Sequence, residues 1–193
     1  MGRSQLEKQK THERIVKLAA KRLREEGLEG IGVADLMKEA GLTVGGFYKH
    51  FGSRDELVAE AMESAIGSWR RQQEEQGIAP ESISLNDYVD GYLSERHRDH
   101  CGEGCAYAAL TADMARSSDA VRAVATEGLR RNFETMAARM PEPETAEARR
   151  KAIIASCLMT GALGLARVAN DEALSNEVLE TVKQFVKALP QAK

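Results

Sequence analysis

The stretch from Val33 to Phe51 combines residue types and spacing that suit contact with a DNA groove. Two segments with helical apolar periodicity, 33–40 and 44–50, flank a turn that contains Gly41, which is the pattern of a helix-turn-helix. Gly41 suits the left-handed backbone that ends a helix, and Thr43 suits the position that precedes the next one. The second segment is therefore the one expected to enter a major groove.

That second segment reads Val44-Gly45-Gly46-Phe47-Tyr48-Lys49-His50. Two glycines inside a helix each cost roughly 1 kcal/mol relative to alanine, and close approach of the backbone to DNA is a physical reason to accept that cost. The polar groups of Thr43, Tyr48, Lys49 and His50 can meet phosphates, and Val44 can touch a thymine methyl group. A plain three-helix subdomain with a glycine-rich turn is the competing interpretation.

A second group of reactive side chains consists of His97, His100, Cys101 and Cys105. Cys105 is expected to be a small buried residue at the start of a helix, because free cysteine is among the most buried residue types. Two alternatives stay open. A thiol at a helix N-terminus has the setting of a redox or electrophile sensor, with Cys101 as its partner, and the four residues together are potential zinc ligands.

The elements that must position these residues are all helical. Apolar periodicity, glycines, prolines and the capping box at 53–56 predict about nine helices and no strand. The expected ranges are about 6–26, 33–40, 44–50, 53–76, 85–97, 105–116, 119–140, 144–170 and 175–189.

Composition limits the classes that remain. The 193 residues are 42% hydrophobic and 30% charged, which suits one globular domain or two small ones and excludes disorder and disulfide scaffolds. Eight Lys and Arg against two Glu in residues 1–24, within a chain of net charge −3, predict a polyanionic partner at one end. Three cysteines, no secretory segment and no apolar run of membrane-spanning length predict a cytoplasmic protein without a membrane partner.

The run Ala40-Gly41-Leu42-Thr43, Phe47-Tyr48-Lys49-His50-Phe51 and Arg54-Asp55-Glu56-Leu57 resembles the N-terminal domain of the TetR family of bacterial repressors. The resemblance covers residues 14–62. It implies a helix-turn-helix DNA-binding domain over 1–52 and a helical-bundle domain for ligand binding and dimerisation over 53–193. It adds Gly45, Gly46 and Arg54 to the DNA-contacting set. Gly46 and the Ile31-Gly32 pair depart from the family pattern, because each lacks a hydroxyl side chain that many members carry.

The resemblance also implies a ligand pocket between the bundle helices and a dimer interface on the last two helices. The pocket candidates are Trp69, Tyr88, Tyr92, Cys105, Met114, Phe133, Met136 and Met159; the alternative is that most of them fill the core. The interface candidates are Gly161, Gly164, Val178, Val182 and Phe185, with an intrachain bundle as the alternative.

The expected function is transcriptional repression. A homodimer would bind a pseudopalindromic DNA operator and release it when a small apolar or aromatic effector binds. No enzyme activity, cofactor or metal is expected. Two alternatives remain: a thiol-based sensor acting through Cys105 and Cys101, and a helical interaction module that does not bind DNA.

Overall fold

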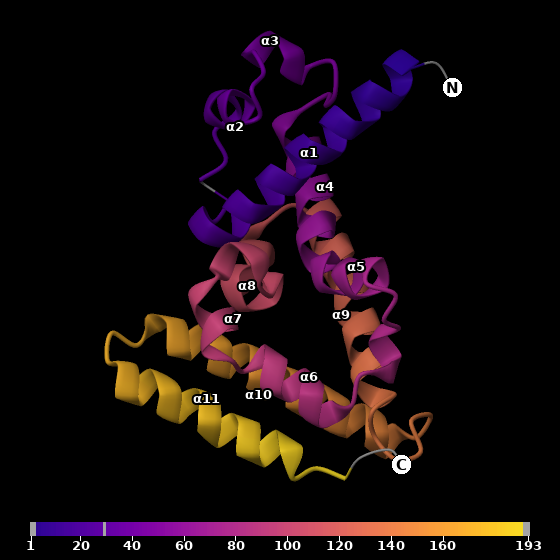
Figure 1. Ribbon diagram of the computed structural model, residues 1–193, viewed down its shortest axis with the longest axis vertical. Helices are drawn as coiled ribbons and strands as arrows, with labels where there is room; N and C mark the ends of the chain where they lie inside the picture. The colour runs from indigo at the N-terminus through magenta and orange to yellow at the C-terminus, as the bar shows by residue number, and fades with distance from the viewer. Residues whose placement is uncertain (1–2, 29, 191–193) are drawn as a thin grey trace.

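The computed structural model describes residues 3–28 and 30–190, and these residues form helices and connecting turns without a strand. Figure 1 shows a small head, formed by the N-terminal part of the chain, above a larger helical body. The head contains α1 (Arg3–Glu26), α2 (Val33–Glu39) and α3 (Val44–Phe47). The body contains α4 (Arg54–Ile66), α5 (Ser68–Glu75), α6 (Leu85–Tyr92), α7 (Glu95–Asp99), α8 (Ala106–Arg116), α9 (Asp119–Ala137), α10 (Ala146–Val168) and α11 (Glu172–Lys187), with 3₁₀ turns η1 (Pro80–Ser82) and η2 (Cys101–Glu103).

The all-α fold is confirmed, with two of the predicted helices each divided into two. The helix expected over 53–76 is interrupted at Gly67, which joins α4 to α5. There the Arg71 guanidinium folds back onto the Ser64 carbonyl and fills the space that a side chain at Gly67 would need. The helix expected over 85–97 ends at Tyr92, and Ser94 starts α7 by accepting a hydrogen bond from the His97 amide at 3.2 Å.

Two apolar cores hold the chain together. The first joins the head to the body: Ile15 and Leu23 of α1 and Phe47 and Phe51 of the head pack with apolar residues of α4, α8 and the start of α9. Met114 of α8 belongs to this first core. The second core lies wholly in the body, between α6, the end of α9, α10 and α11. The expected boundary between residues 52 and 53 coincides with the start of α4, but the first core is continuous across it.

Helix α10 differs from the expectation that no segment is apolar enough to cross a membrane. It has 23 residues, and by length and composition alone it would pass for a span, with a mean hydropathy of 1.4 over its most apolar stretch. In the fold it is the central helix of the second core and packs against α9 and α11. Its other side leaves Ile154, Leu158 and Leu165 exposed, which makes an apolar stripe at helical spacing.

Candidate nucleic-acid interface and ligand cavity

The turn between α2 and α3 has the geometry that its sequence predicts. Gly41 has a φ of +69°, and the Leu42 amide donates to the Met37 carbonyl at 2.8 Å, so that the end of α2 is closed by a left-handed residue. Leu42 is half-buried against the first core. Thr43 occupies the N-cap position of α3, but its hydroxyl makes no capping hydrogen bond. That hydroxyl is exposed and remains available to a partner outside the chain.

Helix α3 is buried on one side and open on the other. Phe47 is buried and packs on Phe51, with ring centroids 5.4 Å apart. The opposite side presents Val44, which is 50% exposed, and Tyr48, which is 74% exposed. Tyr48 is therefore a surface residue. The α-helix ends at Phe47 rather than His50, and residues 48–50 continue as turns.

The glycine pair in α3 is not required by packing within the chain. A Cβ atom at Gly45 would meet nothing within 4 Å, and at Gly46 it would be 3.6 Å from the Met37 side chain, an ordinary contact. Neither glycine has a left-handed φ. The absence of side chains at these two positions thus leaves the backbone of α3 open to close approach from outside.

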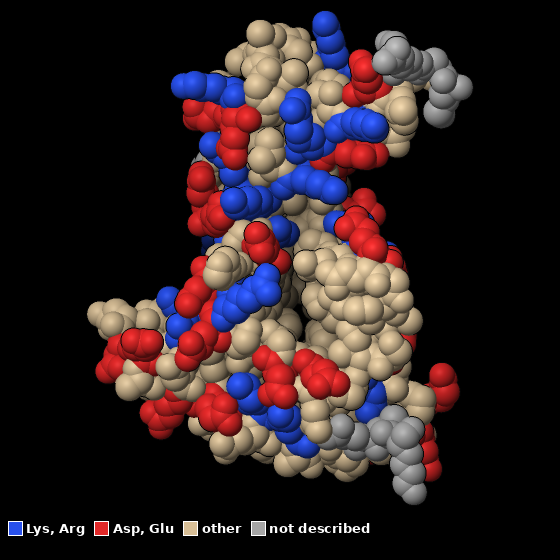
Figure 2. Space-filling view, viewed as in Figure 1, with Lys and Arg blue, Asp and Glu red and all other residues tan. Residues whose placement is uncertain are grey.

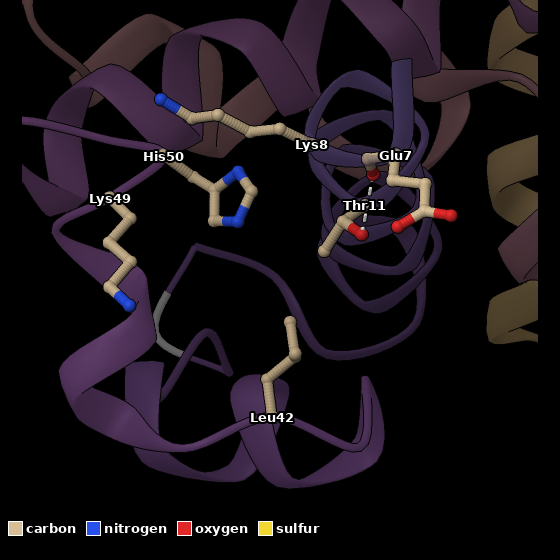
Figure 3. A pocket seen from close by; sticks show the side chains of 6 residues that line it. All are labelled: Glu7, Lys8, Thr11, Leu42, Lys49 and His50. Atoms are coloured by element: carbon tan, nitrogen blue, oxygen red, sulfur yellow. Dashed lines mark hydrogen bonds between the residues drawn. The ribbon is translucent and has the colours of Figure 1, made fainter. Parts of the chain in front are cut away.

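A cleft of about 490 Å³ lies between α1 and the end of the helix-turn-helix. It is lined by Glu7, Lys8, Thr11, Leu42, Lys49 and His50. Figure 3 shows the His50 ring between Lys8 and Lys49. On the α1 side the Thr11 hydroxyl donates a hydrogen bond to the Glu7 carbonyl at 2.9 Å. The His50 Nδ1 atom is shielded from solvent and has no hydrogen-bond partner among the described residues. Burial, with the charges of His12, Lys8 and Lys49, lowers the pKa of His50.

The Arg54 side chain makes hydrogen bonds within the chain. Its guanidinium donates to the Leu28 carbonyl at 2.6 Å and to the Ile31 carbonyl at 3.1 Å, which fixes the connection between α1 and α2. The geometry thus gives this predicted DNA-contacting residue a bracing role. Gly32 precedes α2 without a side-chain cap, in accord with the missing hydroxyl at this position.

The body contains a cavity of about 670 Å³, a size typical of sites for small organic ligands. Its mouth corresponds to the hollow at the centre of the body in Figure 2. Six of the eight predicted pocket residues line it: Trp69, Tyr88, Tyr92, Cys105, Met136 and Met159. Trp69 and Tyr88 meet edge to face at 5.1 Å, and Tyr88 and Tyr92 are 5.9 Å apart, so that one wall is aromatic.

The other two predicted pocket residues do not line the cavity. Met114 lies two turns along α8 from the cavity wall, in the first core. Phe133 is half-buried on α9, whose cavity-lining residues Gly128, Asn132 and Met136 lie on a different side of the helix. Periodicity identifies both residues as apolar-face positions, but it cannot tell which neighbour that face meets.

Polar residues that were not predicted complete the wall of the cavity. Ser156 is 5% exposed, and its hydroxyl has no partner among the described residues. Thr160, one turn further along α10, lies 3.3 Å from the Tyr92 hydroxyl. Arg139 is 4% exposed, and its guanidinium lies 4.5 Å from the centre of the Tyr88 ring. Burial raises the pKa of Tyr88 to about 12 and that of Tyr92 well above its ordinary value, so both phenols remain protonated.

The segment from His97 to Cys105 connects the cavity to α1. The Cys105 amide donates to Nε2 of His97 at 2.9 Å, and Nδ1 of His97 contacts the Tyr92 carbonyl at 2.7 Å. This pairing fixes a neutral ring with its proton on Nδ1. On the far side, Arg24 of α1 donates through Nε to the Gly102 carbonyl at 2.7 Å, and the Cys101 thiol donates to the Arg24 carbonyl at 2.9 Å.

The zinc interpretation does not fit this geometry. Both ring nitrogens of His97 are already engaged, and the Cys101 thiol is directed at α1. No group of three or more His, Cys, Asp and Glu side chains within residues 3–28 and 30–190 is arranged to hold a metal ion. Cys105 lies at the N-cap of α8 and lines the cavity, whereas Cys157 is exposed on α10.

The predicted interface residues fall on different sides of α10 and α11. Gly161 is exposed on the apolar stripe of α10, and Phe185 of α11 is 55% exposed. Val178 and Val182 are half-buried against the second core. Gly164 is half-buried facing α8, where a Cβ atom would be 3.5 Å from the Ala108 carbonyl.

A pH dependence of stability follows from His97. Burial lowers the pKa of this ring, and the neighbouring Arg167 guanidinium lowers it further. The unfolded chain therefore takes up the proton more readily, and stability is lost as the pH falls below about 6.5, the ordinary histidine value. We expect His97→Gln to be less stable than the wild type at pH near 8, since glutamine cannot replace both hydrogen bonds.

The same variant should lose less stability than the wild type between pH near 7 and pH near 5. Urea unfolding at several pH values measures both effects. Parallel curves for the two proteins below pH of about 6.5 would contradict the burial of a neutral His97.

The comparisons with known proteins agree with this geometry. Residues 15–61 match the family model for bacterial regulatory proteins of the tetR family. Two solved structures share the fold with a TM-score of 0.74 and 20% identity: E. coli NemR in its reduced form, covering 95% of this chain and 97% of that one, and a TetR-family transcriptional regulator from Cytophaga hutchinsonii, covering 95% and 96%.

A regulator from Saccharomonospora viridis in complex with choline has a TM-score of 0.71 and 14% identity, and covers 96% of this chain and all of that one. No curated protein matches the sequence. The structural likenesses show the fold, and the sequence match lies over the helix-turn-helix itself. Residues 15–61 thus match the TetR family of bacterial regulatory proteins, and the whole chain shares the fold of solved regulators of that family.

Proposed function

We propose that the chain is a repressor that binds a pseudopalindromic DNA operator as a homodimer and releases it when a small organic effector occupies the cavity. The observation that carries the proposal is the open side of α3. It presents Val44, Tyr48 and Lys49 beside two glycines that packing within the chain does not require. A helix that is buried on the side of Phe47 and has two glycines without side chains elsewhere on its surface is suited to enter a major groove.

The cleft beside α3 supports phosphate contacts at the edge of that groove. Lys8 and Lys49 line it from two parts of the chain, and Nδ1 of the His50 ring between them has no hydrogen-bond partner within residues 3–28 and 30–190. In the view of Figure 2 several Lys and Arg side chains lie on the head. Phosphate contacts of this kind fix a protein on DNA without reading its sequence.

The exposed apolar stripes of α10 and α11 support the homodimer. Leu165 is 63% exposed on α10, and Leu174 and Phe185 are exposed on α11, so both of these packed helices offer exposed apolar side chains to a partner. A second copy related by a two-fold axis would cover it as a four-helix interface. Two heads would then face successive major grooves.

Two connections support release by an effector. Helix α4 packs along α1, and its last residues, from Ala65 to the break at Gly67, line the cavity. The η2 turn joins the cavity wall at Cys105 to Arg24 of α1. An effector that binds better when these contacts shift would favour a spacing of the heads that no longer fits the operator.

Lys49→Ala tests DNA binding. We expect weaker binding to a short palindromic duplex taken from upstream of the gene, with the slope of log affinity against log salt shallower by about one unit. The matched control is Lys151→Ala, which removes an equal charge from α10 in the body. If the wild-type protein binds no such duplex at low salt, the head does not bind DNA, and a helical interaction module becomes the better interpretation.

Gly161→Trp tests the dimer. A bulky side chain on the open stripe should separate the two copies, which sedimentation velocity would record as monomers. Ala120→Trp, on an exposed position at the start of α9, should remain dimeric. Alkylation of Cys157 gives a second readout, because this thiol should react slowly in the wild-type dimer and faster in Gly161→Trp. An unchanged dimer with a reactive Cys157 would place the interface elsewhere.

One observation favours the thiol-sensing alternative: Cys105 lines the cavity, and Cys101 holds the Arg24 carbonyl of α1. If this alternative holds, an electrophile that alkylates Cys105 should release DNA, and Cys105→Ser should abolish that release. Mass spectrometry of alkylated peptides compares the rates of the three cysteines. A Cys105 that reacts no faster than Cys157 in the Gly161→Trp monomer would leave non-covalent effector binding as the mechanism.

A further inference from the structure

The charges around the cavity are unevenly distributed. Five arginines contribute to its lining: Arg70, Arg71, Arg96, Arg131 and Arg139. Three acidic residues do so, and all of them are exposed: Glu63, Asp87 and Glu103. Of the five guanidinium groups, only that of Arg70 forms an ion pair with a carboxylate in the part of the chain that the structure describes, with Glu81 at 2.7 Å and Glu74 at 3.7 Å. The wall therefore carries an excess of positive charge.

Arg139 is the one buried arginine among these five. Its guanidinium donates to three neutral carbonyl oxygens, those of Ile83, Thr135 and Pro80, and so two of its five N–H groups are uncommitted. Burial lowers the pKa of Arg139, which means that the charged form is held there against a desolvation penalty. A negative charge within the cavity would offset that penalty.

One ring of the aromatic wall, that of Tyr88, is already covered by a cation. The Arg139 guanidinium already covers the Tyr88 ring at 4.5 Å, the position in which a ligand ammonium would sit. An ammonium in the cavity would face this charge and would find no buried carboxylate among the lining residues. Trp69 and the edge of Tyr88 still offer apolar area to a flat uncharged ring.

Hydroxyl donors lie on the α10 side of the same cavity. The Ser156 hydroxyl is buried and has no hydrogen-bond partner in the part of the chain that the structure describes, and the hydroxyls of Tyr92 and Thr160 are 3.3 Å apart. An unpaired buried hydroxyl is unfavourable until a ligand supplies an acceptor. Carboxylate oxygens accept several hydrogen bonds, whereas an ammonium group accepts none.

We infer that the cavity takes an aromatic carboxylate, with the ring against Trp69 and Tyr88 and the carboxylate satisfied by guanidinium and hydroxyl donors. The inference rests on the proposed function only in taking this cavity as the effector site. It narrows the effector from any small apolar molecule to an organic anion with a flat apolar body.

Trp69 provides the test, because it is the single tryptophan of the chain and lines the cavity. Its fluorescence is titrated in the full-length protein, without DNA, with three probes of similar shape: para-tert-butylbenzoate, para-tert-butylbenzamide and para-tert-butylbenzyltrimethylammonium. We expect the carboxylate to bind at least about tenfold more tightly than the amide, and the ammonium to bind more weakly than both.

Two variants and a neighbouring control locate the carboxylate. Ser156→Ala removes a donor and should weaken benzoate binding about fivefold. Arg131→Gln removes a charge at the cavity wall and should weaken benzoate binding while leaving amide binding unchanged. Arg130→Gln removes an equal charge from the next residue, which does not line the cavity, and should change neither.

Equal or tighter binding of the amide or the ammonium would overturn the inference, and so would the absence of any fluorescence change up to about 10 mM benzoate. The inference would also be overturned if Arg131→Gln and Arg130→Gln changed benzoate binding equally and Ser156→Ala left it unchanged. Since these titrations contain no DNA, their outcome is independent of whether the head binds an operator. Tight benzoate binding without release of DNA would contradict the proposed function and leave the ligand class intact.

Discussion

The burial of α1 against α4 is the constraint on which the rest of the structure depends. Ile15, Ala19 and Leu23 of α1 are fully or almost fully removed from solvent, and the residues that cover them come from both the head and the body. The helix-turn-helix is too small to enclose such a core alone, since short segments bury too little apolar surface to offset the entropy of folding. The orientation of α3 therefore depends on helices that lie far from it in sequence. Two polar contacts fix the same helix: His12 with Glu60 of α4 at 2.6 Å and Arg22 with Glu39 of α2 at 2.7 Å.

Arginines that are buried or half-buried hold several short segments of the fold in place. Arg24, Arg139 and Arg167 donate mainly to backbone carbonyls of turns rather than to carboxylates. Carbonyl partners satisfy the donors but do not cancel the charge, and burial lowers the pKa of both Arg24 and Arg139. These side chains fix η1, η2 and the segment around His97, which are short turns that lack an apolar face of their own. Arg139, which holds η1 in place, also lines the cavity and contributes to its positive charge.

Local chemistry decided which features could be predicted from the sequence. The end of α2 at Gly41 and the start of α4 at Ser53 were predictable, because each depends on a residue acting on its own backbone. The break at Gly67 was missed, since nothing in the sequence tells an interrupted helix from a glycine that is tolerated within one. Ser156 and Thr160 line the cavity, but nothing in the sequence tells them from the other small residues of α10. Met114 was assigned to the ligand pocket, but it packs in the first core. Arg54 was assigned to DNA contact, but its guanidinium donates to carbonyls of the α1–α2 connection. Both contacts depend on the tertiary arrangement, which periodicity does not encode.

The continuity of the first core across residue 52 affects how such a protein can diverge. Val58 and Ala61 of α4 and Leu110 of α8 complete the environment of α1, so a head transferred from a relative would meet a surface shaped for a different partner. Exchange of the head by recombination at this boundary would require matched changes in α4 and α8. The exposed side of α3 makes no such contacts, and so residues such as Val44 and Tyr48 are free to vary one at a time. Under the proposed function, new operator preferences would therefore be reached more readily by point substitution on α3 than by exchange of whole domains.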